Sequence, residues 1–328
     1  MALAVCLGGS PSLPAQDASL SPQARQAGPA EALYLQLSSV DLDASRVFRV
    51  RGASLDRASI HITLEDGNIS FTKDVLGRIT GAFFEGDGEL LLVPPDDVER
   101  RSMSLFTGMA VLEERFSTAY LRFNDDTALE LQSSLRQSQD AEDFVTRWNQ
   151  TAHNLAQEDG MRLLASFTEM LPISGGTDGL AITRTLDPED RLLHARLQGN
   201  TLGVFDVFFD STAAEQVEAG QAKRTDNGGV FYDVWTSFST ANAAPSRAAE
   251  KDIPETLPPE TGSYQDPVLV RRYVIDAHVK PPKELDAAVS LELEVKRGGS
   301  RFLVFELSHF LDVKSVEADG RQVEFIHN

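Results

Sequence analysis

Two acidic runs hold the side chains with the clearest capacity for chemistry. The first is Asn124, Asp125 and Asp126, directly after the expected strand "TAYLRF", and the second is "DPED", residues 187–190. Amide and carboxylate oxygens are the ligands that Ca²⁺ and similar hard cations take in proteins. Acidic runs after a strand also form solvated turns that cap helices, and we expect that structural role for both.

The six histidines form no recognisable zinc motif. They occupy positions 61, 153, 194, 278, 309 and 327, and none is followed by glutamate or paired with a histidine four residues away. A helical His-Glu-x-x-His site is therefore absent from the sequence. His278 and His309 lie on or beside expected strands, where we expect surface or packed histidines without a partner.

Nucleophile and nucleotide motifs are missing as well. The sequence has no Gly-x-Ser-x-Gly elbow and no phosphate-binding loop ending in Gly-Lys-Ser or Gly-Lys-Thr. Gly86-Asp87-Gly88 is a lone glycine pair, which indicates a hairpin turn. Since the single cysteine, Cys6, falls near the N-terminus, the rest of the chain offers no thiol. We therefore expect no catalytic, cofactor-binding or metal-binding residue in this chain.

Composition and charge narrow the class of partner. The 328 residues include 30 Lys+Arg and 50 Asp+Glu, a formal net charge of -20, and 41% are hydrophobic. This length and composition predict a globular protein of about two domains. A strongly acidic surface repels phosphate backbones and anionic lipids, so nucleic acid is not an expected partner.

Residues 1–28 have the features of a leader. A short apolar run is followed by small, turn-forming and polar residues, and no Lys or Arg precedes Arg25. A secretory signal has a basic segment before an apolar run of about 7–15 residues, so this stretch corresponds to the rear half of one; an ordinary disordered leader is the alternative. We predict export to the periplasm or the medium. The apolar run is too short to span a bilayer.

Residues 29–240 predict an α+β domain in which antiparallel strands dominate. A short helix is expected over 31–40. It is followed by a meander of alternating segments with hairpin turns at "EDGN", residues 65–68, and "EGDGE", residues 85–89.

One long amphipathic helix is expected to cover this sheet. Apolar residues recur at helical spacing from 140 to 159, and Phe144 and Trp148 are expected to be core anchors. Further strands are expected over 191–199, 203–211 and 229–239.

A proline-rich stretch over 241–267 predicts a linker. Beyond it, the segments 273–279 and 289–295 alternate and place their apolar residues on one face of an antiparallel pair. The apolar run over 301–307 suits a central strand, and Asp319-Gly320 predicts a hairpin turn. These strands leave an apolar face without a cover, so we expect 268–328 to be a partial β-sandwich that continues past its last residue.

The final stretch resembles the opening of the N-terminal β-domain of M1-family zinc aminopeptidases. The pattern of that family is similar to the strands at 273–279 and 289–295, to the apolar run at 304–307, and to "LDVKSVEADG" at 311–320. The earlier segment "ITGAFFEGDGELLLVPP", with "RRSMSLFTG", is similar to an additional domain found ahead of M1-like modules in some exported bacterial proteins.

The resemblance implies a parent protein that is a secreted or periplasmic zinc metallopeptidase. In that family a zinc-bound water attacks the peptide carbonyl with a glutamate as general base. The zinc-binding helix and the Gly-x-Met-x-Asn substrate loop lie downstream of the β-domain, and no residue here matches either. This chain would then be a noncatalytic N-terminal portion, with zinc in a downstream catalytic domain and with downstream domains of the same polypeptide, and peptides, as partners. The alternative hypothesis is a periplasmic or secreted β-rich binding or scaffold protein without catalytic activity.

Overall fold

Antiparallel strands dominate the structure, a computed structural model, and a few helices accompany them, which confirms the β-rich α+β class. The predicted linker over 241–267 lies outside the described residues. The structure describes residues 2–6, 28–138, 144, 148, 153–171, 186, 189–225, 230–240, 268–281, 284–296, 302–308 and 311–327.

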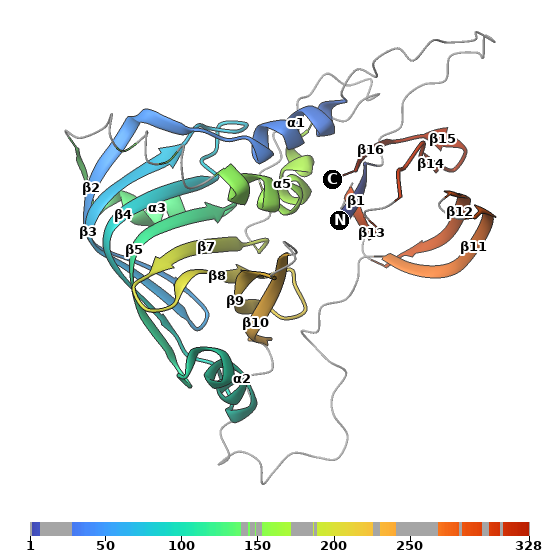
Figure 1. Cartoon of the computed structure of the whole chain (residues 1–328). Coiled ribbons are helices and arrows are strands. Elements are labelled where there is room, and N and C mark those ends of the chain that lie inside the picture. Colours follow the sequence, from blue (N-terminus) through green and yellow to red (C-terminus); the bar gives the residue numbers. More distant parts are fainter. Residues whose placement is uncertain are drawn as a thin grey trace, which may run out of the picture.

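A nine-stranded antiparallel sheet runs in the order β10-β9-β8-β7-β5-β4-β3-β2-β6. Most neighbours in the sheet are also neighbours along the chain, so the predicted meander is confirmed. Figure 1 shows that the sheet curls strongly. The strands are β2 (Leu42–Arg57), β3 (Ile60–Thr72), β4 (Gly81–Leu92), β5 (Leu112–Phe123), β6 (Leu135–Gln137), β7 (Leu192–Gly199), β8 (Gly203–Asp210), β9 (Val217–Arg224) and β10 (Val230–Phe238).

Helices lie at both ends of this sheet. Helices α1 and α5 lie together near one end and α2 near the other (Figure 1). The predicted helix over 31–40 is present as α1, although Leu35 points away from the core that buries Leu33 and Leu37. The helices are α1 (Pro29–Ser38), α2 (Asp97–Thr107), α3 (Thr127–Gln132) and α5 (His153–Phe167), and a 3-10 turn covers Thr168–Met170.

The predicted long helix is described in part. Most of 139–152 lies outside the described residues, whereas α5 continues past the predicted end at residue 159 as far as Phe167, which is fully buried. Phe144 and Trp148 are buried as expected, and Trp148 meets the ring of Tyr120 at 4.7 Å between centroids. Their prediction as core anchors is confirmed.

Helix α2 was not predicted from the sequence, although its boundaries carry clear signals. The Asp96 carboxylate accepts hydrogen bonds from the backbone N–H groups of Val98 and Glu99, at 2.9 and 3.0 Å. Gly108 ends the helix in the left-handed region, with φ 77°. An aspartate cap and a C-terminal glycine are the usual limits of a helix.

Both predicted hairpin turns at the glycine-rich motifs are wrong. Strands β3 and β4 continue through these motifs without reversing, and Gly67 pairs with Gly86 on the neighbouring strand. A bulge lies between Glu85 and Gly88, and a Cβ atom on Gly88 would come within 2.3 Å of the Phe116 ring. The glycines therefore mark a bend of the sheet, where a ring from the next strand lies against bare backbone.

Beyond the linker, β11 (Val268–Lys280) and β12 (Glu284–Val295) form the predicted antiparallel pair. Asp319 and Gly320, with φ 51° and 71°, form the predicted turn between β14 (Glu317–Ala318) and β15 (Arg321–Gln322). Positive φ at both central residues is typical of a tight hairpin turn.

Strand β13 (Phe302–Glu306) does not take the predicted central place. It lies at the edge of a sheet ordered β13-β1-β16. The centre is β1 (Ala2–Cys6), from the stretch expected to be a leader, and β16 (Glu324–His327) lies on its other side. An apolar run alone does not distinguish a central strand from an edge strand, because the distinction depends on which segments pair with it.

Candidate functional site

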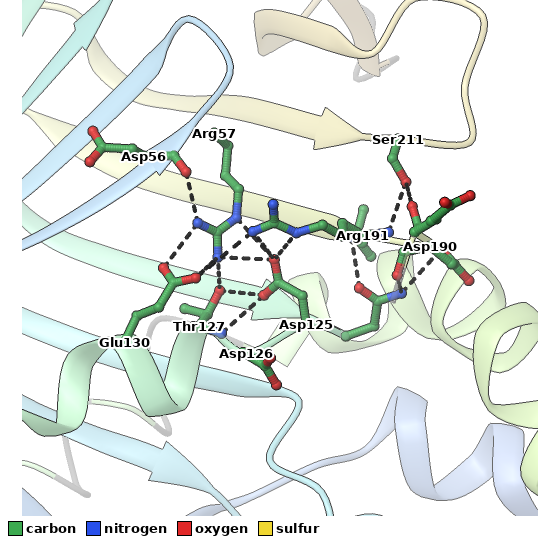
Figure 2. A network of polar contacts seen from close by, with 12 residues as sticks. Asp56, Arg57, Asp125, Asp126, Thr127, Glu130, Asp190, Arg191 and Ser211 are labelled. Carbon is green, nitrogen blue, oxygen red and sulfur yellow. Dashed lines mark hydrogen bonds and ion pairs between the residues drawn. The ribbon is translucent and has the colours of Figure 1, made fainter. Parts of the chain in front are cut away.

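The first acidic run lies in a network of ion pairs where β2, β5 and α3 end or begin (Figure 2). Asp125 follows β5, and its Oδ2 accepts from Arg57 Nε at 2.9 Å and from Arg191 Nε at 3.2 Å. The Arg57 guanidinium also donates to both carboxylate oxygens of Glu130, at 3.0 and 3.1 Å. The side chains of Arg57 and Asp125 are 2% and 5% exposed, so the pair is buried.

Asp125 is fully engaged and is unsuited to bind a cation. Burial favours the neutral carboxyl, but hydrogen bonds from Thr127 and the charge of Arg57 outweigh it and hold the pKa of Asp125 below its ordinary value. The carboxylate thus stays ionised between two guanidinium groups, which would repel a metal ion. Its Oδ1 accepts from the backbone N–H of Thr127 at 3.1 Å, whereas Asp126, the N-cap residue of α3, makes no side-chain capping hydrogen bond. The expectation of a solvated turn holds only for Asp126, whose side chain is 74% exposed.

The structure describes only part of the second acidic run. Asp187 lies outside them, whereas Asp190 Oδ1 accepts from Arg162 Nη2 at 2.5 Å and from Asn124 Nδ2 at 3.2 Å. Arg162 on α5 also donates from Nε to Asp210 at 2.6 Å. The arginine therefore joins the helix to the end of β8, and Asp125 and Asp190, one from each acidic run, serve in structural ion pairs.

His194 is the centre of a second buried cluster. Its Nδ1 lies 2.8 Å from Asp159 on α5, and its Nε2 lies 3.2 Å from Asp206 on β8. The imidazole stacks on Phe208, with 3.7 Å between ring centroids. Arg196 donates to both oxygens of Asp206, at 2.7 and 3.1 Å.

The cluster holds a charged imidazole. Burial alone would lower the pKa of His194, but Asp159 and Asp206 outweigh it and raise the pKa to about 9. The protonated ring donates to a carboxylate from each nitrogen, so it has no free nitrogen with which to accept a proton from a substrate. The geometry therefore suits a structural link between α5 and the sheet and does not suit a general base.

Sequence reasoning did not find this cluster. His194 and Arg196 are two residues apart on β7, and Asp206 and Phe208 are two residues apart on β8. Each pair therefore lies on one face of its strand. Register pairs His194 with Phe208 and Arg196 with Asp206. The alternation was visible, but nothing local showed that α5 covers that face.

Two other histidines, His61 and His278, lie apart from this cluster. His61 is 46% exposed and pairs with Asp56 at 2.6 Å, and His278 is exposed on β11. His309 and the side chain of His153 lie outside the described residues. Among the residues that the structure describes, no three His, Cys, Asp or Glu side chains are grouped so as to hold a metal ion.

A groove of about 390 Å³ opens beside the His194 cluster, between α5 and strands β8 to β10. Its polar residues include Glu158, Arg196 and Glu218, and its apolar wall includes Phe208, Phe231 and Tyr232. Burial and the nearby charge of Glu215 raise the pKa of the Glu218 carboxyl. An aromatic wall with carboxylates is an arrangement suited to a cationic ligand.

Comparison of this chain with known protein families, with curated proteins and with solved structures finds no match. In the described part of the chain, no helix has both the length and the apolar character needed to cross a membrane. The functional conclusion therefore depends on the residues of the chain itself.

Proposed function

We propose that the chain is the noncatalytic N-terminal portion of an exported zinc metallopeptidase of the M1 type. In this proposal the nine-stranded sheet and its helices flank the catalytic region, and residues 268–328 begin a β-sandwich completed by downstream domains of the same polypeptide. Export is proposed from the sequence features of residues 1–28 alone, since residues 2–6 form strand β1 between β13 and β16 in the structure.

One observation carries the proposal: an apolar sheet face on β11 and β12 is open to solvent. Tyr273 and Ile275 are each 63% exposed, Val279 is 64% exposed and Val289 is 55% exposed. The register pairs Ile275 with Val289, so these side chains form one continuous face. A two-stranded hairpin is marginal in water, and a contiguous exposed apolar patch marks a surface that another layer covers.

The state of the buried charged residues supports a noncatalytic role. Asp125 is held between two guanidinium groups, and both nitrogens of His194 face carboxylates. Neither is available for proton transfer to a substrate. In this proposal, catalysis in the parent protein belongs to residues outside this chain.

The test begins with the coding sequence downstream of Asn328. We expect a His-Glu-x-x-His helix and a distant glutamate, and we expect the longer product to bind zinc and to hydrolyse an aminoacyl substrate in a chelator-sensitive manner. The present chain, assayed in parallel, is expected to do neither. Amide exchange on β11 and β12 should slow in the longer product, because a second layer covers their apolar face.

The alternative is a β-rich binding or scaffold protein without catalysis, and the groove beside β10 favours it. A stop codon directly after Asn328, or a longer product without zinc and with unchanged exchange on β11 and β12, would refute the metallopeptidase proposal and leave this alternative.

A further inference from the structure

The groove beside the His194 cluster has a rigid aromatic wall. Phe208 is held by its stack on His194. Tyr232 lies against the backbone of β9, where a Cβ atom on Gly220 would come within 2.6 Å of its ring. Phe231 is 46% exposed on the same edge strand. Ring faces attract alkylammonium and guanidinium groups, and fixed rings lose little freedom when a ligand binds.

Arg196 is the one cation among the described residues that line the groove, and its charge is already paired. Arg196 donates to both oxygens of Asp206 and, at 2.9 Å, to Glu158. Its charge is therefore balanced within the protein, and a phosphate or carboxylate ligand would be repelled by the carboxylates of Glu158, Asp206 and Glu218 that line the groove.

Glu218 differs from Glu158 and Asp206, the other acids of the groove, in its contacts with the described residues. Within the described residues its carboxylate makes no hydrogen bond or ion pair, although it faces the same space as Phe208 and Tyr232. Glu158 is half-exposed at the rim. Burial and the like charges of Glu215 and Asp206 disfavour an ionised Glu218 more than the charge of His194 favours it, so an approaching cation would stabilise the ionised carboxylate.

From these features we infer that the groove binds an alkylammonium or alkylguanidinium group, with Glu218 as its counter-ion and Tyr232 as its stacking platform. Such a group is the end of a lysine or arginine side chain, or a small free amine. The net charge of -20 would draw either toward the protein. This inference is independent of the peptidase proposal, because it concerns only residues of this chain.

The test uses the full 328-residue chain in ligand-observed NMR titrations with n-butylammonium and n-butylguanidinium, and with n-butanol as the neutral probe. A short alanine peptide carrying one lysine, and the same peptide with norleucine in its place, distinguish a peptide side chain from a free amine. We expect the cationic probes to bind and the neutral ones not to bind. Binding of the lysine peptide without the free amine identifies peptides as the source of the cation; binding of the free amine identifies the cationic group alone as sufficient.

The variants separate the groove from general charge attraction. Glu218→Gln should weaken binding by roughly tenfold, and Tyr232→Ala by roughly three- to tenfold, whereas Tyr232→Phe should retain most of it. Glu113→Gln on exposed β5 surface changes the net charge equally and should leave binding unchanged. Thermal unfolding checks that each variant folds. Equal effects of Glu218→Gln and Glu113→Gln, equal binding of the norleucine peptide, or no binding of any cation would overturn the inference.

Discussion

His194→Gln is the change that tests the buried charge cluster most directly. The structure places the imidazole of His194 between Asp159 and Asp206, with its side chain 1% exposed, and the two carboxylates favour its protonated form. Glutamine fills similar space and hydrogen-bonds, but it carries no charge. Asp206 would keep Arg196, whereas Asp159 would lose its cation. Removing one member of a buried ion pair costs about 3–5 kcal/mol, so we expect a loss of unfolding free energy of about that size at neutral pH.

The same cluster fixes how that loss changes with pH. The pKa of His194 rises from 6.5 to about 9 on folding, and each pH unit between the two values is worth about 1.4 kcal/mol. A pKa that is raised in the folded state stabilises the protein below the unfolded pKa, and this stabilisation is lost as pH rises through the folded pKa. The difference in unfolding free energy between the wild-type protein and the variant should therefore fall by about 3 kcal/mol between about pH 6.5 and pH 10.

The assay is urea unfolding, followed by tryptophan fluorescence, of wild type and variant over that pH range. Lysines and tyrosines titrate in both proteins, so the difference between the two isolates His194. His61→Gln is the matched control, since its side chain is 46% exposed and its pair with Asp56 lies in solvent; it should cost under about 1 kcal/mol. A wild-type advantage that stays constant up to about pH 10, or an NMR titration of the His194 ring near its ordinary pKa, would refute the reasoning.

Three further changes test other parts of the structure. Asp125→Asn leaves two guanidinium groups without their shared carboxylate and should lower the unfolding free energy by about 3 kcal/mol in urea at neutral pH; Asp126→Asn, at an exposed position, should change it by less than about 0.5 kcal/mol, and equal losses would contradict the network. Gly88→Ala places a Cβ atom 2.3 Å from the Phe116 ring and should cost about 1–3 kcal/mol; an unchanged Tm would show that the bulge adapts freely. Ile275→Lys, at a side chain 63% exposed, should change the stability of this chain by less than about 0.5 kcal/mol, and a large loss would mean that β11 is already covered.

Local sequence patterns predicted strands and turns correctly where the residues that form the pattern are the ones that form the element. Alternating apolar residues identified β7, β8, β11 and β12. The pair Asp319-Gly320 identified a hairpin turn because a tight turn needs positive φ at two successive residues, which aspartate and glycine tolerate.

Glycine was misinterpreted because it permits two different structures. Gly67 and Gly86 lie in motifs that predict hairpin turns, but they are opposite one another in continuous strands. What decides between a reversal and a bend is a ring on a neighbouring strand: Phe84 lies against Gly67, and Phe116 lies against Gly88. The actual reversal between β2 and β3 occurs at Ala58, with φ 51°, where no glycine signals it. The information that separates these cases comes from cross-strand contacts.

The His194 cluster was missed for a related reason. Polar residues that alternate along a strand usually face water, and on that rule β7 and β8 have a solvent face. In the structure α5 covers part of that face and brings Asp159 to His194 across 35 residues of sequence. Burial of these groups is tolerated because each charge meets an opposite charge, whereas the Glu218 carboxylate on β9 makes no hydrogen bond or ion pair with the residues that the structure describes. Helix α5 thus buries His194 in a structural ion-pair cluster and, at the same place, borders a groove whose carboxylates favour a cation.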